Sequence, residues 1–258
     1  MDNLPLWISR HVLGLWAGVL VLALLVADFA WRRARRSRLA ATGRDGYLAL
    51  RLDTATTLLV LFAALFLLLA WAVWTRTALV EFDMALAQAL HDGLSRNLLQ
   101  VVAVVTHAGD PWLLVVAASA IALALALRRR WHLFLPWAVA LGGVAGSDEA
   151  IKQFVQRPRP FGGHGFIVET GFSFPSGHAA GSMVFFGMLA WLLLRLWPPQ
   201  RHRDVITAAV AMVAVIGFSR VVLQVHYLSD VLAGQALGAC WLVLGIALGE
   251  QLRRGQAR

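Results

Sequence analysis

The chain has 258 residues, of which 59% are hydrophobic and only 14% are charged. Average soluble domains carry about a quarter charged residues, and a soluble globule of the present composition would expose large apolar patches. Disorder, a collagen-like chain and a disulfide scaffold are excluded too, because the chain is apolar, lacks a glycine period and has one cysteine. The composition therefore predicts an all-α, polytopic transmembrane helical bundle.

Seven apolar runs approach the roughly 20 residues that a membrane-spanning helix needs. They are residues 11–31, 54–74, 111–127, 131–151, 177–197, 205–222 and 228–249. Residues 75–96 are expected to form an amphipathic surface helix, and residues 97–107 an interfacial or re-entrant helix. The third span is short, but Asp110 and Pro111 supply a predicted N-cap and a proline at the first helical position.

The positive charges are divided unevenly between the two ends of these spans. The net charge is +9, and sixteen of the 23 Arg and Lys residues flank one set of span ends. The positive-inside rule places that set in the cytoplasm, with the N-terminus outside. The outer side then holds Arg10, Arg76, Arg96, Lys152, Arg157, Arg159 and Arg220. No base-stacking or basic–aromatic motif accompanies the charge, so nucleic-acid binding is not predicted.

Two polar clusters on the predicted outer side follow the fourth span. The first holds Lys152, Arg157 and Arg159. Arg157 taken alone is expected to reach toward lipid head groups. The second is the run Pro-Ser-Gly-His at residues 175–178, in which Ser176 is a predicted N-cap. A helix N-terminus binds anions because its backbone N–H groups point outward.

A third polar cluster comprises Ser219 and Arg220, followed by His226 and Asp230. His226 and Asp230 are four residues apart, so they share a face on a continuous helix. Such a carboxylate either accepts the histidine N–H and leaves the other ring nitrogen free as a nucleophile or base, or merely satisfies a boundary histidine. The three clusters together carry the groups that phosphoryl transfer needs without a metal. Their many cations repel a divalent ion, so neither a metal nor another cofactor is predicted.

The spacing of the three clusters resembles the signature of the phosphatidic acid phosphatase type 2 superfamily. Its parts are Lys152, six residues and Arg159-Pro160; Pro175-Ser176-Gly177-His178; and Ser219-Arg220, five residues, His226, three residues and Asp230. The resemblance implies a six-span lipid phosphatase core over residues 54–258. Residues 1–53 would add an N-terminal transmembrane helix and a basic cytoplasmic loop. Haloperoxidases share similar motifs, but they are soluble, and seven apolar spans argue against one.

The resemblance also implies a role for each matching residue. His226 would attack phosphorus and form a phosphohistidine, and Asp230 would orient His226. His178 would protonate the leaving oxygen and then activate water. The phosphate-binding residues would be Lys152, Arg159, Ser176, Gly177 and Arg220, while Ser219 would assist them or only shape the helix end.

Several residues near the signature match no motif position. Asp148, one turn before the signature lysine, is expected to position that lysine. The Gly- and Phe-rich loop at residues 161–174 is expected to form a lid that carries His164 and Glu169. His164 is expected to be a surface residue, and His107 has no motif support.

The sequence thus predicts a metal-independent lipid phosphatase at the outer face of the bacterial inner membrane. The favoured substrate is undecaprenyl pyrophosphate, with Arg157 and the lid assigned to its second phosphate. The alternatives are a broad phosphatidate or phosphatidylglycerophosphate phosphatase, and a phosphotransferase acting on a lipid or glycan acceptor. A lipid carrier or scramblase would need polar residues throughout the spans, whereas here they gather at one face. The sequence does not predict an oligomeric state.

Overall fold

The computed structural model describes residues 3–39, 50–160 and 166–256. Within these residues every regular element is helical. The α-helices are α1 (Asn3–Leu39), α2 (Leu52–Trp74), α3 (Ala78–Gly93), α4 (Arg96–Thr106), α5 (Pro111–Leu127), α6 (Trp131–Val155), α7 (Gly177–Leu196), α8 (His202–Val222) and α9 (Leu228–Gln256). Two short 3-10 helices, η2 (His107–Gly109) and η3 (Pro199–Arg201), precede α5 and α8.

Six of the described segments are long and apolar enough to cross a membrane. They are Leu4–Arg32, Leu52–Trp74, Arg96–Leu127, Gly177–Leu196, Pro199–Val222 and Leu228–Arg253. In α1 and α2 only 6% and 17% of the most apolar window is buried, as expected where lipid covers the outer faces of a bundle. The predicted all-α, polytopic membrane fold is confirmed, and the chain is an integral membrane protein.

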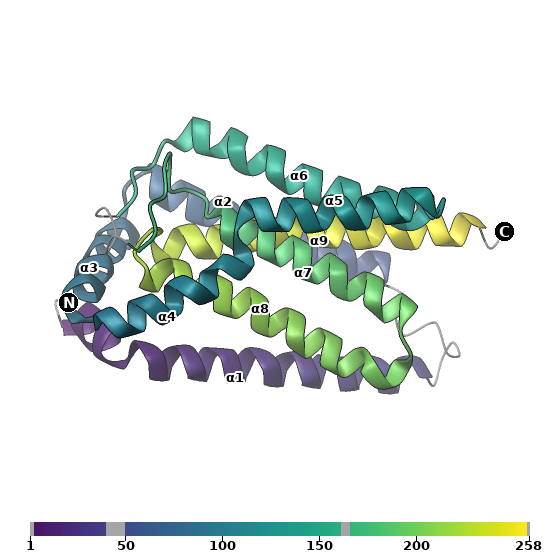
Figure 1. Cartoon of the computed structure of the whole chain (residues 1–258), viewed down its shortest axis with the longest axis horizontal. Helices are drawn as coiled ribbons and strands as arrows, with labels where there is room; N and C mark the ends of the chain where they lie inside the picture. Colours follow the sequence, from purple (N-terminus) through teal and green to yellow (C-terminus); the bar gives the residue numbers. More distant parts are fainter. Residues whose placement is uncertain (1–2, 40–49, 161–165, 257–258) are drawn as a thin grey trace.

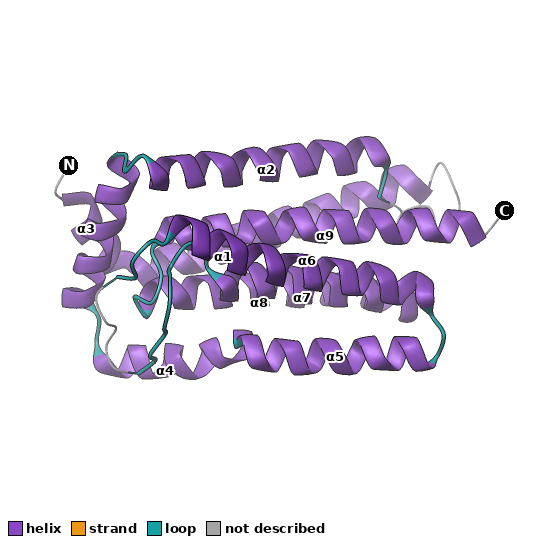
Figure 2. Cartoon of the chain, turned by 90° about the horizontal axis from the view of Figure 1, so that it is seen from above, coloured by secondary structure: helices purple, strands orange, loops and turns teal. Residues whose placement is uncertain are grey.

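Two of the expected elements differ from the prediction. α6 is 25 residues long but is not among the six apolar segments, because its glycines, aromatic start and charged end lower its hydropathy. α4 was expected to be separate from the third span. Instead η2 continues the helical course from α4 into α5, so that residues 96–127 form one apolar segment along an edge of the bundle (Figure 2).

The helix α9 lies at the centre and packs against α2, α6 and α7 (Figure 1). Its contact with α7 is close, because a Cβ atom on Gly234 would lie 2.5 Å from the carbonyl oxygen of Ser176, and one on Gly238 would lie 2.6 Å from that of Ala180. Glycines four residues apart permit such backbone approach between membrane helices. This contact holds the start of α9 against the start of α7.

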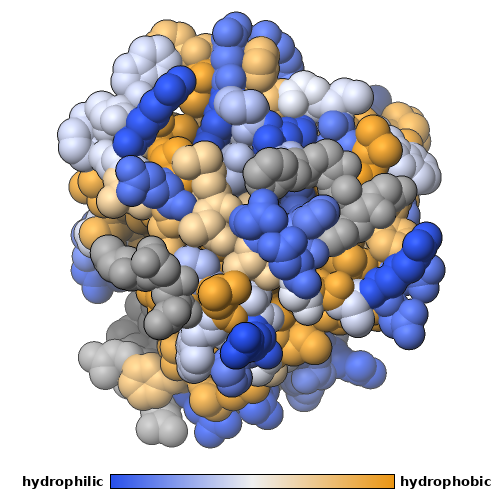
Figure 3. Space-filling view, turned by 90° about the vertical axis from the view of Figure 1, so that its left-hand side faces the viewer, coloured by the Kyte–Doolittle hydropathy of each residue, from blue (hydrophilic) through white to orange (hydrophobic). Residues whose placement is uncertain are grey.

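The described connections between the helices lie at two ends of the bundle (Figure 1). The N-terminus, α3 and the connections before α7 and α9 lie at one end, whereas the C-terminus and the α5–α6 and α7–α8 connections lie at the other (Figure 1). At the latter end Arg203 pairs with Asp28 of α1 at 2.7 Å. Hydrophilic side chains gather on the former end (Figure 3), which is where the signature residues lie.

Candidate active site

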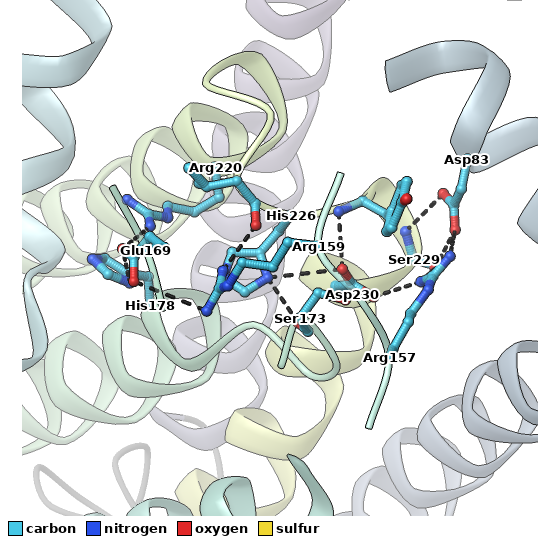
Figure 4. A network of polar contacts seen from close by, with 12 residues as sticks. Asp83, Arg157, Arg159, Glu169, Ser173, His178, Arg220, His226, Ser229 and Asp230 are labelled. Carbon is cyan, nitrogen blue, oxygen red and sulfur yellow. Dashed lines mark hydrogen bonds and ion pairs between the residues drawn. The ribbon is translucent and has the colours of Figure 1, made fainter. Parts of the chain in front are cut away.

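The three parts of the signature meet at one end of the bundle, where Figure 4 shows His226 between two polar groups of residues. On one side lie Arg220, Glu169 and His178, and on the other lie Asp230, Arg157 and Asp83. The backbone N–H of Ser176 donates to the carbonyl of Asp230 at 3.0 Å, which joins the second and third parts directly.

His226 is 2% exposed, and its two ring nitrogens face different partners. Nδ1 lies 2.7 Å from the carbonyl oxygen of Ser173 and 3.7 Å from Oδ2 of Asp230. Nε2 lies 3.0 Å from Nη1 of Arg159, which can only donate. These partners place the proton on Nδ1 and a lone pair on Nε2. The nearest acceptor of the Nδ1 proton is therefore Ser173, which the sequence analysis did not include, with Asp230 behind it.

The lowered pKa of the buried His226 ring suits a nucleophile. Desolvation lowers the pKa of His226 to about 4, although the neighbouring Asp230 raises it in part. The ring is therefore neutral near pH 7. A neutral imidazole has the free electron pair that nucleophilic attack requires.

The carboxylate of Asp230 is fixed mainly by residues other than His226. Its Oδ1 lies 2.5 Å from Nη1 of Arg157, and its Oδ2 accepts the backbone N–H of Tyr227 at 2.9 Å. Nη2 of Arg157 in turn lies 2.9 Å from Oδ2 of Asp83 on α3. Ser229 joins the same network by donating to Asp83.

Two predictions for Arg157 are wrong. Its side chain is 6% exposed and stacks over the ring of Tyr227 with 4.1 Å between the guanidinium carbon and the ring centre. It therefore does not reach toward lipid head groups, and its donors are occupied by buried carboxylates rather than free for a second phosphate. The sequence signal for its partner was weak: Asp83 is an acidic residue on the face of α3 that also buries Leu86, Ala87 and Leu90.

The cations Arg159 and Arg220 converge on the carboxylate of Glu169. Arg220 is fully buried and donates through Nη2 to Oε1 of Glu169, whose Oε2 lies 3.9 Å from Nη2 of Arg159. Arg159 also donates to the carbonyls of Thr170, Gly171 and Val225 at 2.8–3.2 Å. The expected lid thus enters the site. Residues 161–165, including His164, lie outside the described residues.

Glu169 is ionised in this setting. Burial is the largest influence and raises its pKa, but Arg220, His178 and Arg159 together outweigh it and hold the pKa below its usual range. A carboxylate thus occupies the place among three basic side chains that the sequence analysis assigned to phosphate.

Lys152 and the start of α7 form the remaining wall of the site. Nζ of Lys152 lies 2.5 Å from Oδ2 of Asp148, so the expected positioning of Lys152 by Asp148 matches the geometry. A Cβ atom on Gly177 would lie 2.9 Å from Oδ2 of Asp148 and 3.0 Å from that Nζ. Glycine at this position therefore lets the lysine approach the helix N-terminus.

Three buried polar atoms beside this wall have no hydrogen-bond partner among the described residues. They are Oγ of Ser176, Nε of Arg220 and Oδ1 of Asp148. Ser176 does occupy the N-cap of α7, but its side chain makes no capping hydrogen bond. Unsatisfied buried donors are costly, and a bound anion would satisfy the hydroxyl and the guanidinium. Ser219 instead donates to the carbonyl of Ile216 at 2.6 Å, and its Oγ lies 2.7 Å from Oγ1 of Thr106, which suits a role in shaping the helix end.

His178 is buried beside two carboxylates that the sequence analysis did not connect with it. Its Nε2 lies 3.3 Å from Oδ1 of Asp110, and its Nδ1 lies 3.8 Å from Oε1 of Glu169. The other oxygen of Asp110 lies 2.7 Å from Nδ1 of His107. Asp110 occupies the N-cap position of α5 as predicted. Its carboxylate makes no capping hydrogen bond to that helix and contacts the two histidines instead.

A cavity of about 450 Å³ opens on these residues. Its polar wall includes Lys152, Arg159, His178 and His226, and its apolar wall is formed by residues of α5 and α6 such as Leu114 and Val144. Among the described residues, no group of three or more His, Cys, Asp or Glu side chains could hold a metal ion.

Residues 131–254 match the PAP2 superfamily. This segment is a PAP2 domain. It spans α6 to α9 and contains all three parts of the signature, so the PAP2 superfamily domain expected from the sequence is confirmed over these residues, and the chain is a membrane phosphatase. Asp83, Thr106 and Asp110 contact the PAP2 domain from outside the matched residues.

Individual relatives extend the match beyond the PAP2 domain. The chain is 28% identical over 191 residues to phosphatidylglycerophosphatase B of Bacillus subtilis (strain 168), covering 73% of this chain and 93% of that protein. It is 33% identical over 120 residues to human dolichyldiphosphatase 1, covering 40% of this chain and 50% of that protein. The crystal structure of a transmembrane PAP2-type phosphatidylglycerolphosphate phosphatase from Bacillus subtilis superposes with a TM-score of 0.65 at 26% identity, covering 78% of this chain and 97% of that chain.

Proposed function

We propose that this lipid phosphatase releases the terminal phosphate of a lipid phosphate through a phosphohistidine on His226. The cavity carries the proposal, because a single space joins the basic residues to the apolar surfaces of α5 and α6. A phosphate group fits the basic part, and an acyl or polyprenyl chain fits the apolar part. A soluble phosphate ester would leave the apolar wall without a partner.

In the first step, Nε2 of His226 attacks phosphorus, and the bond from phosphorus to the lipid oxygen breaks. Ser173 and Asp230 hold the Nδ1 proton, so Nε2 keeps its lone pair for the attack. His178 gives a proton to the departing lipid oxygen. In the second step, His178 takes a proton from water, the water oxygen bonds phosphorus, and the bond between phosphorus and Nε2 breaks.

The basic residues of the site stabilise the charge that develops on phosphate in both steps. Lys152, Arg159 and Arg220 supply positive charge without a metal, and preorganised donors of this kind lower phosphoryl-transfer barriers. Ser176 and the N–H of Gly177 add donors at the start of α7. Glu169 has to leave this position before phosphate enters, because the two anions cannot share it.

The proposed site faces the outside of the bacterial inner membrane. The support is the charge asymmetry: the end opposite the site holds the connections in which most Arg residues lie, and these are expected in the cytoplasm. Residues 1–53 then form an N-terminal addition to a six-span core over residues 54–258.

The proposed substrate class is a phosphoglycerolipid such as phosphatidylglycerophosphate. It is favoured by the relative named phosphatidylglycerophosphatase B, which the chain matches over 93% of that protein's length. A polyprenyl pyrophosphate such as undecaprenyl pyrophosphate is the second candidate, favoured by the similarity to dolichyldiphosphatase 1. The engagement of Arg157 by Asp83 and Asp230 removes one sequence argument for that second candidate.

The test is phosphate release by the purified protein in detergent. The panel holds phosphatidylglycerophosphate, phosphatidate, undecaprenyl pyrophosphate and a short-chain soluble phosphate ester, each with excess chelator. We expect kcat/KM to be highest for a lipid substrate and unaffected by the chelator. Preference for the soluble ester would contradict the lipid assignment, and transfer of phosphate to an added lipid or glycan instead of water would favour a phosphotransferase.

A further inference from the structure

The carboxylate of Asp110 lies between two histidines at the junction of η2 and α5. Its distances are 2.7 Å to Nδ1 of His107 and 3.3 Å to Nε2 of His178. Asp110 makes no side-chain hydrogen bond to α5, and Pro111 at the first helical position has no N–H to offer. The carboxylate therefore serves the two rings and not the end of the helix.

These contacts fix which nitrogen of His178 faces the cavity. The ring is 4% exposed and begins α7. Its Nε2 faces Asp110, which can only accept a proton, while Nδ1 lies 3.8 Å from Oε1 of Glu169. A carboxylate beside a histidine fixes the ring orientation and favours the protonated imidazolium. In its protonated form the ring thus presents Nδ1–H to the place assigned to phosphate.

We propose that Asp110 is a positioning residue for His178 in the proposed reaction, on which this inference rests. Asp110 accepts a hydrogen bond from Nε2–H of His178 and stabilises the imidazolium. His107 contacts the other oxygen of the Asp110 carboxylate. The proton that reaches the leaving oxygen comes from Nδ1 of His178, while Nε2 keeps its proton and Asp110 stays ionised. A residue outside the PAP2 domain thereby sets the acid strength of a residue inside it.

The groups around His178 determine the direction of the expected pH effect. They are Asp110 from the η2–α5 junction, Glu169 from the loop before α7, Arg220 from α8 and His226 from the connection before α9. Burial is the largest influence and favours the neutral ring, as do Arg220 and His226, whereas the two carboxylates favour the imidazolium. Replacing Asp110 by a neutral residue shifts this balance toward the neutral ring. The acid form of His178 is then lost at a lower pH.

The test compares Asp110→Asn with the wild type on two esters whose leaving groups differ in basicity. Departure of the glycerolipid oxygen of phosphatidylglycerophosphate needs a proton, whereas departure of p-nitrophenolate does not. For the variant, kcat/KM should fall about 10- to 100-fold on the lipid ester, which is less than the roughly 10²–10⁴-fold that a general acid contributes, because His178 itself remains. The loss on p-nitrophenyl phosphate should be less than about threefold. The basic limb of the pH profile on the lipid ester should move to lower pH. An equal loss of kcat/KM on both esters would overturn the positioning role.

Two controls separate this role from folding and from general loss of charge. Asp92→Asn removes an exposed carboxylate at the same end of the bundle. This variant should leave kcat/KM unchanged on both esters. Vanadate, an anion that resembles phosphate, should raise the Tm of Asp110→Asn as much as that of the wild type, because the cations remain. Loss of that Tm shift would also overturn the role. Wild-type inactivity on both esters would defeat the proposed function itself, and this inference with it.

Discussion

Nη1 of Arg157 lies 2.5 Å from Oδ1 of Asp230, and both side chains are buried. The same guanidinium pairs with Asp83 on α3, so one cation contacts two carboxylates and ties the start of α9 to a helix outside the PAP2 domain. A buried ion pair gives little net stability, but removing one partner leaves an uncompensated charge. The orientation of Asp230 behind His226 therefore depends on Arg157.

Replacing Arg157 should damage stability and turnover together. Arg157→Leu leaves Asp83 and Asp230 without their shared cation, which should cost about 3–5 kcal/mol of stability. We expect a lower Tm in detergent and loss of most phosphatase activity. Asp83→Asn keeps the pair between Arg157 and Asp230, so both losses should be smaller. The matched control is Arg10→Leu, which removes an exposed arginine of α1. A wild-type Tm for Arg157→Leu would refute this account of the network.

Sequence patterns predicted the elements and the signature better than the contacts between them. The bounds of α5 and the starts of α7 and α9 agree with the predicted ones, because prolines, glycines and apolar runs mark them locally. The roles of Arg157, Asp110 and Glu169 were missed, since each partner lies on another element, 51–74 residues away. No helical period or local motif encodes such a pairing. Asp83 on the apolar face of α3 was the one local sign of a buried partner.

The nucleophile assignment predicts a covalent intermediate on one residue. His226→Ala should retain the wild-type Tm shift with vanadate but lose turnover by several orders of magnitude, because no other described side chain presents a free ring nitrogen at Nε2's position. Rapid acid-free quenching with a radiolabelled lipid phosphate should give a phosphoprotein that is stable to base and labile to acid. Its absence from the wild type, or its persistence in His226→Ala, would remove the assignment.

The buried His226 predicts how activity and stability change with pH. Its pKa of about 4 lies below the ordinary 6.5, so the folded protein binds fewer protons at this site than the unfolded chain between these values. Stability contributed by the neutral ring is complete above about pH 6.5 and decreases as pH falls toward 4. The Tm of the wild type should therefore drop more over this range than that of His226→Gln. The acidic limb of kcat/KM should also lie well below pH 6.5, and parallel Tm curves for the two proteins would contradict the assigned pKa.

Glu169 should compete with phosphate for the basic residues. Its carboxylate contacts Arg220 and lies 3.8–3.9 Å from His178 and Arg159. A phosphate or vanadate bound to the same basic residues would lie close to this carboxylate, and two negative charges repel strongly in a partly buried site. Glu169→Gln should therefore bind vanadate about tenfold more tightly, a change of about 1.4 kcal/mol. Glu81→Gln, a change on the surface of α3, should leave the inhibition constant unchanged. Weaker inhibition of Glu169→Gln would mean that the carboxylate assists anion binding.

The proposed orientation can be tested with two single cysteines placed at opposite ends of the bundle. Val168 is 83% exposed in the loop before α7, and Arg201 is exposed in the connection between α7 and α8. In a Cys240→Ser background, an impermeant maleimide should label Val168→Cys in intact cells, because the site end faces outward. The same reagent should label Arg201→Cys only after lysis, because the arginine-rich connections favour the cytoplasm. Both variants should keep phosphatase activity, which certifies that each is folded. The reverse labelling pattern would invert the orientation and place the site on the cytoplasmic face, while leaving the chemistry of His226 and His178 untouched.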